Sequence, residues 1–224
     1  MKRLYHWSLD PVARTARLAL AEKRLAFEEV ETRPWAVHPD MERLGPGAAP
    51  PAFVDTTGEG RITLLGTHAL LEYLDDAYPN PRLIPAGHQD AAEARRLWRW
   101  CEDSFQVVTE NLLTERTAQW VRRDRQPDSG ALRKGAHALR GRLTFLNALT
   151  ETRSYVAGRH LTMADLAVAA HLSSVDYFGD VDWAAVPDLR AWYARMKSRP
   201  SFRGLLADRI DGTRPAAHYA DLDF

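Results

Sequence analysis

Three polar side chains near the start of the sequence are of types that take part in catalysis. Tyr5 and Ser8 carry hydroxyl groups, and Asp10 stands directly before Pro11. A hydroxyl pointed at a bound thiol stabilises the thiolate and lowers the pKa of the thiol, whereas an ionised carboxylate in that place raises it. Because proline is favoured as the first residue of a helix and aspartate as the residue before it, Asp10 either caps a helix or has chemistry of its own.

A second candidate site is the proline pair Pro50-Pro51, which follows a glycine-rich approach and precedes a short apolar run. Proline cannot donate a hydrogen bond to a sheet, so we expect Pro51 at the beginning of a strand, where its peptide bond can be cis. A sharp turn of this kind exposes main-chain N–H and C=O groups to a ligand. The alternative is an ordinary stiff loop.

Short patterned segments predict the elements that position these residues. We expect strands at residues 3–7, 27–32, 52–55 and 61–65, helices at 11–23 and 67–78, and a weak helix or loop at 35–44. The order is strand, helix, strand, helix, strand, strand, helix. It places Asp10 before the first helix, Pro51 before the third strand, and Gly66-Thr67 at the start of the last helix.

The second half is predicted to be all helical. Residues 80–87, with Pro81 and Pro85, read as a linker, and apolar residues then recur at helical spacing from residue 90 onward, with Cys101 on the core side. Thr162 and Asp165 have the spacing of a capping box before a helix that is apolar nearly all round. We therefore divide the chain into an α/β domain at 1–79, a linker at 80–87, a helical domain at 88–207 and a tail at 208–224.

Composition excludes several classes of function. Thirty basic residues balance thirty acidic ones, so the overall charge favours neither nucleic acid nor an anionic membrane as a partner. The single cysteine excludes an intramolecular disulfide and a multi-cysteine metal site, and no metal is expected. No apolar run approaches the roughly 20 residues of a membrane helix, and no signal peptide is apparent. A reduced, cytoplasmic protein is expected.

The first half resembles the thioredoxin-like domain of the glutathione S-transferase (GST) superfamily. The matching segments are Leu4-Tyr5, Arg17-Leu18-Ala19-Leu20, the turn at Pro51 and Ala69-Leu70-Leu71-Glu72-Tyr73-Leu74. The resemblance implies a GST fold, with an α/β thioredoxin-like N-terminal domain and an all-α C-terminal domain. It also implies that the proline turn lies where these enzymes hold the cysteinyl backbone of glutathione.

Two departures from the superfamily pattern argue against catalysis. Asp10-Pro11 stands where the enzymes have Ser-Pro or Cys-Pro, and Gly66-Thr67 stands where they commonly have Glu-Ser. The first change removes the group that stabilises the thiolate, and the second removes a carboxylate that holds the amino-acid end of glutathione. We therefore interpret Asp10, Pro51, Gly66 and Thr67 as a vestigial glutathione cleft and expect no cofactor, although backbone contacts at Pro51 and a role for Thr67 stay open.

The C-terminal tail points to a resemblance with a smaller group of proteins within the superfamily. Its end, residues 218–224, alternates apolar residues with carboxylates, so the tail either packs over the protein's own cleft or serves as a linear docking motif. Together with residues 22–25, 31–35 and 197–203, this ending resembles the transferase-like cell-division proteins of alphaproteobacteria that bind FtsZ. That resemblance implies a non-catalytic homodimer at the division site, which ties FtsZ filaments to constriction and septal wall synthesis.

Candidate partner contacts follow from residue type and place. Trp35 is either exposed or packed at the domain interface, and the basic side chains of the second long helix are either solvated or docked on an acidic partner. The candidates are Trp35, Arg133, Lys134, Tyr219, Asp221, Asp223 and Phe224. Two alternatives remain at this point: a glutathione-dependent transferase or isomerase that uses Ser8 or Tyr5, and a module that carries an unknown small ligand.

Overall fold

The structure is a computed structural model that describes residues 1–36, 38–58 and 60–224. Its N-terminal part has the predicted element order, confirming the sequence pattern. The elements are β1 (Lys2–His6), α1 (Pro11–Glu22), β2 (Glu28–Glu31), α2 (Pro39–Leu44), β3 (Ala52–Asp55), β4 (Ile62–Leu65) and α3 (Thr67–Ala77). Asp10 caps α1, as its position before Pro11 predicts.

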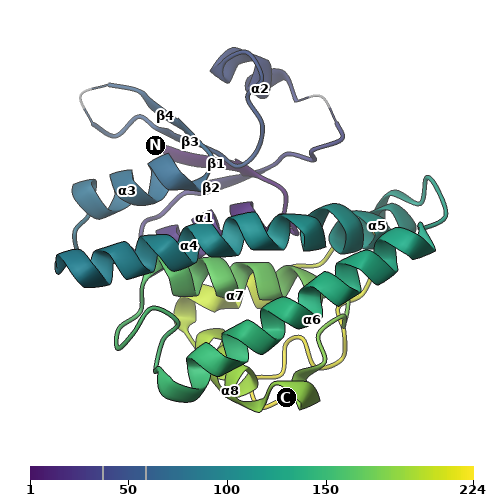
Figure 1. Cartoon of the computed structure of the whole chain (residues 1–224). Coiled ribbons are helices and arrows are strands. Elements are labelled where there is room, and N and C mark those ends of the chain that lie inside the picture. Colours follow the sequence, from purple (N-terminus) through teal and green to yellow (C-terminus); the bar gives the residue numbers. More distant parts are fainter. Residues whose placement is uncertain (37, 59) are drawn as a thin grey trace.

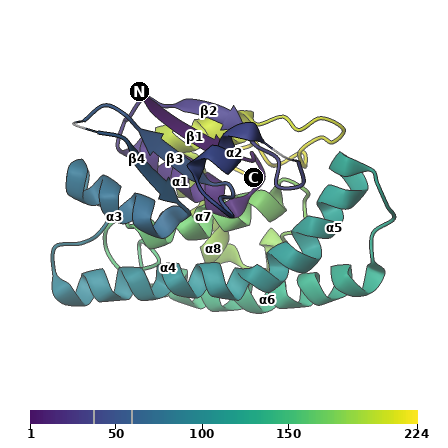
Figure 2. The same cartoon turned by 90° about the horizontal axis from the view of Figure 1, so that it is seen from above.

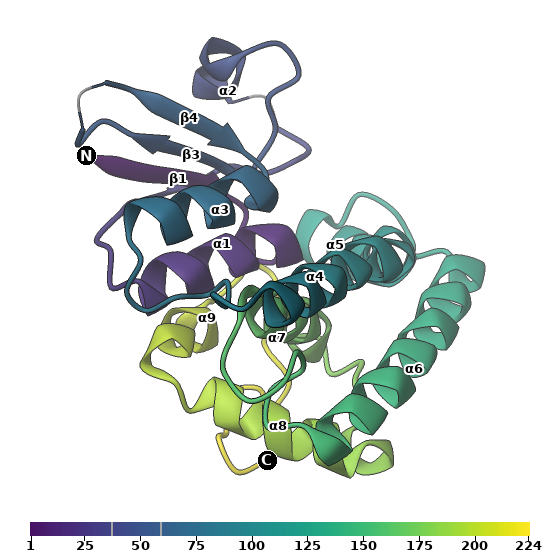
Figure 3. The ribbon, with the colours of Figure 1, turned by 60° about the vertical axis from the view of Figure 1, so that its left-hand side comes forward.

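The four strands form one mixed sheet in the order β2-β1-β3-β4. β1 is parallel to β2 and antiparallel to β3, and β3 is antiparallel to β4. Figure 3 shows α1 and α3 on the face of the sheet that is turned toward the helical domain, while α2 lies on the other side. The peptide bond between Pro50 and Pro51 is cis, so of the two alternatives for the residue that precedes β3, the structure has the cis turn.

The C-terminal part is helical, and its longest elements flank a central helix. They are α4 (His88–Val108), the π-helical turn η1 (Thr109–Leu113), α5 (Thr114–Thr117), the π-helical turn η2 (Ala118–Arg122), α6 (Ser129–Thr152), α7 (Met163–Asp176), the short 3₁₀ turn η3 (Trp183–Ala185), α8 (Pro187–Lys197), η4 (Pro200–Phe202) and α9 (Arg203–Ala207). Figure 2 shows α4 and α6 along one side of the molecule. These elements confirm the GST-like fold class.

Helix α7 is the centre of the helical domain, and each of its residues is buried. The capping box before it is formed as predicted: Thr162 N–H donates to Asp165 Oδ2 at 2.9 Å, and the Thr162 hydroxyl accepts from Ala164 N–H at 3.3 Å. Burial raises the pKa of Asp165 to about 6. α7 packs against α1, so the helix that Asp10 caps joins the two domains (Figure 1).

Cys101 is buried in the shared core, as the helical pattern predicts. Among the residues that the structure describes, no helix is long and apolar enough to cross a membrane.

Candidate functional site

The three polar side chains at the start of the chain have different partners. Asp10 accepts a hydrogen bond from Ala13 N–H at 2.7 Å, and burial raises its pKa to about 6. The Tyr5 hydroxyl donates to Asp40 at 3.1 Å, and the Ser8 hydroxyl donates to Glu31 at 3.2 Å. Both hydroxyl groups are therefore hydrogen-bonded to carboxylates of the protein. The start of α1 has no hydroxyl group, because that position holds Asp10.

The cis-proline turn offers few groups to a ligand. Proline has no N–H, so neither Pro50 nor Pro51 can donate a main-chain hydrogen bond. The carbonyl of Pro51 already accepts from Gly66 N–H at 2.9 Å, and Ala52 is paired with Tyr5 and Leu65 within the sheet. The turn borders a groove of about 350 Å³, but it has no free donor for a peptide-like ligand.

A carboxylate of the protein itself lies at the start of α3. Gly66 precedes this helix and makes no side-chain capping bond, and the Thr67 hydroxyl donates to Glu102 Oε1 at 2.6 Å. Glu102 also binds Trp98 Nε1 at 2.9 Å and His68 Nε2 at 2.6 Å. A helix N-terminus attracts negative charge, and here Glu102 of α4 supplies it. Thr67 is therefore engaged across the domain interface.

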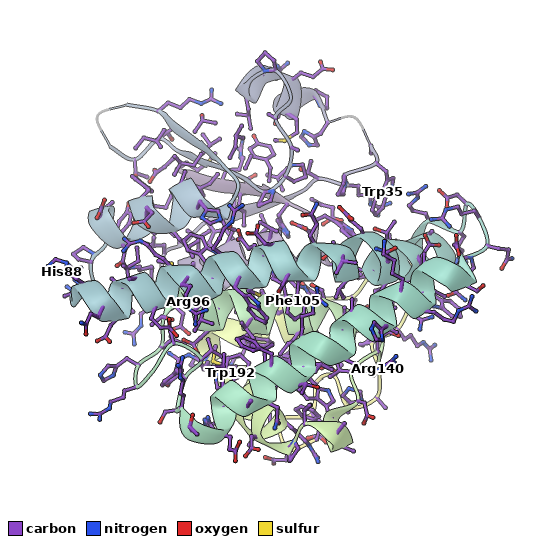
Figure 4. All side chains as sticks on the ribbon, in the orientation of Figure 1. Trp35, His88, Arg96, Phe105, Arg140 and Trp192 are labelled. Atoms are coloured by element: carbon purple, nitrogen blue, oxygen red, sulfur yellow. The ribbon has the colours of Figure 1, made fainter. Side chains whose placement is uncertain are left out.

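Trp35 lies at the edge of a second pocket, between the two domains. Its ring meets Trp7 edge-on with centroids 4.9 Å apart, and the guanidinium of Arg122 lies 5.7 Å from its centroid. The side chain is nevertheless 38% exposed. Asp10 borders the same pocket, which has a volume of about 350 Å³. Both expectations for Trp35 hold in part: it packs at the domain interface and still faces solvent (Figure 4).

The tail is held by buried ionic contacts to α1 of the N-terminal domain. Asp208 Oδ2 accepts from Arg14 at 3.1 Å and from Arg17 at 2.8 Å. The Tyr219 hydroxyl accepts from Arg14 at 2.9 Å and donates to the carbonyl of Leu205 at 3.1 Å. Tyr219 is fully buried, so its assignment as a partner contact is contradicted for this conformation, because a contact residue must be accessible.

The last residues lie over α7 and α8. The ring of Phe224 lies 3.8 Å from Lys197 Nζ and 5.1 Å from Trp183, and it is half-buried. His218 Nε2 is 2.7 Å from Asp176 Oδ1. The tail thus packs on its own protein, but over the helical domain rather than over the pocket beside Asp10. Asp221 and Asp223 are exposed.

The remaining candidates, Arg133 and Lys134, are exposed on α6 and far along the chain from Trp35. Within the described residues, neither makes a side-chain hydrogen bond or ion pair, so both are free for an acidic partner.

Sequence reasoning missed Glu102 and Arg122. Arg122 belongs to a visibly charged turn, but nothing in that turn indicates that Arg122 covers Trp35. No group of His, Cys, Asp and Glu in the described part of the chain could hold a metal ion.

Comparison with known proteins agrees with this geometry. Residues 4–82 match the family described as glutathione S-transferase, N-terminal domain, and residues 136–209 match glutathione S-transferase, C-terminal domain. FtsZ-localized protein A of Caulobacter vibrioides is 43% identical over 224 residues, which are 100% of this chain and 98% of that protein. A probable maleylacetoacetate isomerase of Vibrio cholerae is 25% identical over 208 residues, covering 89% of this chain and 92% of the relative.

Solved structures of similar proteins also match the chain over its whole length. The structure of FzlA from C. crescentus superimposes with a TM-score of 0.95 at 43% identity, covering 100% of this chain and 99% of the other. A glutathione S-transferase from Rhodospirillum rubrum F11 has a TM-score of 0.90 at 39% identity, with 100% of both chains covered. The chain therefore belongs to the glutathione S-transferase superfamily and, within it, to the family of FtsZ-localized protein A.

Proposed function

We propose that this chain is a non-catalytic cell-division protein that binds FtsZ filaments and couples them to constriction and septal wall synthesis. The observation that carries the proposal is the 43% identity with FtsZ-localized protein A over the whole chain. On this proposal the protein is cytoplasmic, acts at the division site and needs no cofactor. The internal bonds of the cleft residues support it, because Asp10, Pro51 and Thr67 already have partners within the protein.

The contact with FtsZ is proposed to centre on Trp35. An exposed tryptophan beside an arginine combines a large apolar surface with a charge, and residues of these two types dominate the energy of many interfaces. Arg133 and Lys134 on α6, and Asp221, Asp223 and Phe224 in the tail, are the alternative contact groups. As a homodimer, the protein would present two copies of each group, and binding along a polymer would gain avidity.

Co-sedimentation of the purified protein with GTP-assembled FtsZ tests the proposal. We expect the wild-type protein to pellet with the polymer and Trp35→Ala to bind at least about tenfold more weakly, because a central aromatic contact is lost. Phe145→Ala is the matched control, since Phe145 on α6 is an aromatic residue with the same 38% exposure. Double charge reversals at Arg133 and Lys134, and at Asp221 and Asp223, test the other two groups separately.

The outcomes separate the contact from the function. If Trp35→Ala pellets like the wild type and one double variant does not, FtsZ binding stands and the contact lies at that other group. If the wild-type protein stays in the supernatant at both low and moderate salt, the division proposal fails. Matching melting temperatures are required of each variant, so that loss of binding is not loss of folding.

A glutathione-dependent transferase or isomerase is the second candidate. It is favoured by the 39% identity, over the full length of both chains, with the structure described as a glutathione S-transferase from Rhodospirillum rubrum. The lack of a donor at Pro50-Pro51 argues against it. We expect no retention on immobilised glutathione and no conjugation of chlorodinitrobenzene above the uncatalysed rate, even for Asp10→Ser. Turnover by the wild type would replace the division proposal with this one.

A further inference from the structure

A groove on the helical domain is not accounted for by the proposed function. It lies between η2 and the part of the tail around Gly212, and its volume is about 620 Å³. Three of the side chains that line it are arginines and none is a carboxylate. The lining includes Arg116, Trp120, Arg123, Phe178 and Arg214. We call it the arginine groove. Arg123 follows Arg122 directly, so the groove adjoins the pocket of Trp35 across η2.

The charges in the arginine groove are only partly compensated. Arg116 is paired with Asp180 at 2.6 Å. Among the described residues, Arg123 donates only to main-chain carbonyls, to Trp120 at 3.4 Å and to Gly212 at 2.9 Å. Arg214 has no side-chain hydrogen bond or ion pair to any residue in the described ranges. Because the chain as a whole is neutral, two uncompensated guanidinium groups in one groove create a local positive field.

The groove is built by a close approach that the sequence has to permit. Gly212 has φ +86°, and a Cβ there would lie 2.9 Å from the carbonyl oxygen of Trp120. Only glycine combines that backbone conformation with so short a distance. Arg123, at φ 55°, then joins η2 to the tail through its bond to Gly212. Residues 212–214 of the tail thus form one wall of the groove.

The rim of the groove is apolar. Trp120 is 45% exposed, which is unusual for so large an apolar side chain, and the half-buried Phe178 lines the same groove. Trp120 lies on a π-helical turn, and such turns are frequent at functional sites. A small inorganic anion would use the arginines but not these rings. A peptide that carries both carboxylates and an apolar side chain would use both.

We propose that the arginine groove binds an acidic peptide segment of a protein partner, with carboxylates on Arg123 and Arg214 and an apolar side chain on Trp120. Arginine binds carboxylates through two parallel hydrogen bonds, which gives such a contact both strength and orientation. The residues that line this groove differ from those of the contact proposed at Trp35. The proposal for the groove therefore does not depend on which group of this protein binds FtsZ.

Fluorescence anisotropy with the full-length protein tests the groove. The probe is a fluorescein-labelled octapeptide of alternating aspartate and phenylalanine, and its control is the same peptide with asparagine in place of aspartate. We expect the acidic peptide to bind at least about tenfold more tightly, and to weaken several-fold between about 50 and 200 mM salt, because salt screens exposed charges. Arg214→Glu is expected to lower the affinity at least about tenfold, since it reverses one of the two free charges.

Arg214→Glu is the deciding variant, because the Arg214 side chain has no partner in the described part of the chain whose loss would unfold the groove. Arg123→Glu gives the same loss on this proposal but also breaks the bond to Gly212, so its melting temperature is compared with the wild type. Arg140→Glu, an exposed arginine of α6 outside the groove (Figure 4), is the matched control and is expected to bind like the wild type.

Three outcomes would overturn the proposal: equal binding of the two peptides, unchanged binding by Arg214→Glu, or complete competition by inorganic phosphate at about 10 mM, with the ionic strength held equal by adjusting the salt so that charge screening does not change. The last result would identify a site for small anions instead. The assay contains no FtsZ, so its failure would leave the division proposal intact, and failure of co-sedimentation would leave the groove intact.

Discussion

The predicted glutathione cleft and the surface on either side of η2 use their polar groups in opposite ways. In the cleft, the Asp10 carboxylate, the Pro51 carbonyl and the Thr67 hydroxyl are each bonded to another group of the protein. On the surface across η2, Trp35 and Trp120 are exposed and Arg214 has no side-chain partner among the described residues. A polar group that already has an internal partner gains little from a ligand, because the old bond must break first.

The tail also has both polar groups that are bonded within the protein and polar groups that are exposed. Its first part is fixed from below by Arg14 and Arg17 through Asp208, and Tyr219 is buried beneath it. Its last carboxylates, Asp221 and Asp223, face solvent. The difference indicates that the underside of the tail stabilises the fold while the outer side is free for recognition. Changes at Arg14, Asp10 and His218 test the contrasts in the tail and in the cleft, in order of the expected change in stability.

Arg14→Ala is expected to have the largest effect. Arg14 is fully buried and donates to the Ser8 carbonyl, Ser173, Tyr219 and Asp208 at 2.7, 2.8, 2.9 and 3.1 Å. Removing one partner of a buried charge pair leaves the others unsatisfied, and we expect the free energy of unfolding to fall by about 3 kcal/mol. Urea denaturation measures it, with exposed Arg203→Ala of α9 as the control. A loss below about 1 kcal/mol would show that the tail is not anchored in this way.

The sequence predicted those features that depend on a few adjacent residues. The element order, the cap at Asp10 and the capping box of Thr162 and Asp165 were predicted and are found in the structure, and the cis bond at Pro51 was one of the two alternatives for that turn. Each follows from local rules, because a cap or a turn satisfies main-chain groups only a few residues away. The GST fold followed from the order of these elements together with the family resemblance.

Contacts between distant residues could not be predicted in this way. Glu102 reaches Thr67 across 35 positions and Arg14 reaches Tyr219 across 205, so both pairs exist only once the domains have packed. Tyr219 stands in an alternating, acidic tail that looks exposed in the sequence, yet it fills a space beside Trp7, Leu9 and Tyr177. The arginine groove also joins residues about 90 positions apart, and no motif marks it.

Asp10→Asn tests the cleft through its dependence on pH. Burial raises the pKa of Asp10 from 3.8 to about 6, so between these values the folded state holds a proton that the unfolded state has lost. The free energy of unfolding therefore falls as pH rises from about 4 to 6, and Asp10 contributes on the order of 2 kcal/mol to that fall. Asparagine keeps an oxygen that can accept from Ala13 but does not titrate, so the variant should show a smaller fall.

Urea denaturation at several pH values measures the effect of Asp10→Asn. Asp165, whose pKa is also about 6, is present in both proteins, so the difference between their pH profiles isolates Asp10. Parallel profiles would mean that Asp10 is solvated as a normal carboxylate. The cleft would then be more open to a charged ligand than the comparison with the outer surface implies.

His218→Gln is expected to have the smallest effect and to sharpen the distinction within the tail. The hydrogen bond to Asp176 raises the pKa of His218, while Lys197 and Arg190 oppose its charge. A raised histidine pKa adds stability that is complete below about pH 6.5, the unfolded value, and is lost as pH rises through the folded pKa. Because a third of the side chain is exposed, we expect less than about 1 kcal/mol.

Hydrogen exchange of the amides in residues 215–224 measures the change at His218. After correction for the intrinsic exchange rate, protection of these amides in the wild type should decrease as pH rises above about 6.5, and in His218→Gln it should not depend on pH over this range. The same pH dependence in both proteins would assign it to another group under the tail. Loss confined to the last residues, with Tyr219 still protected, would show that the ionic contact at Asp208 holds the underside while the end that carries Asp221 and Asp223 opens.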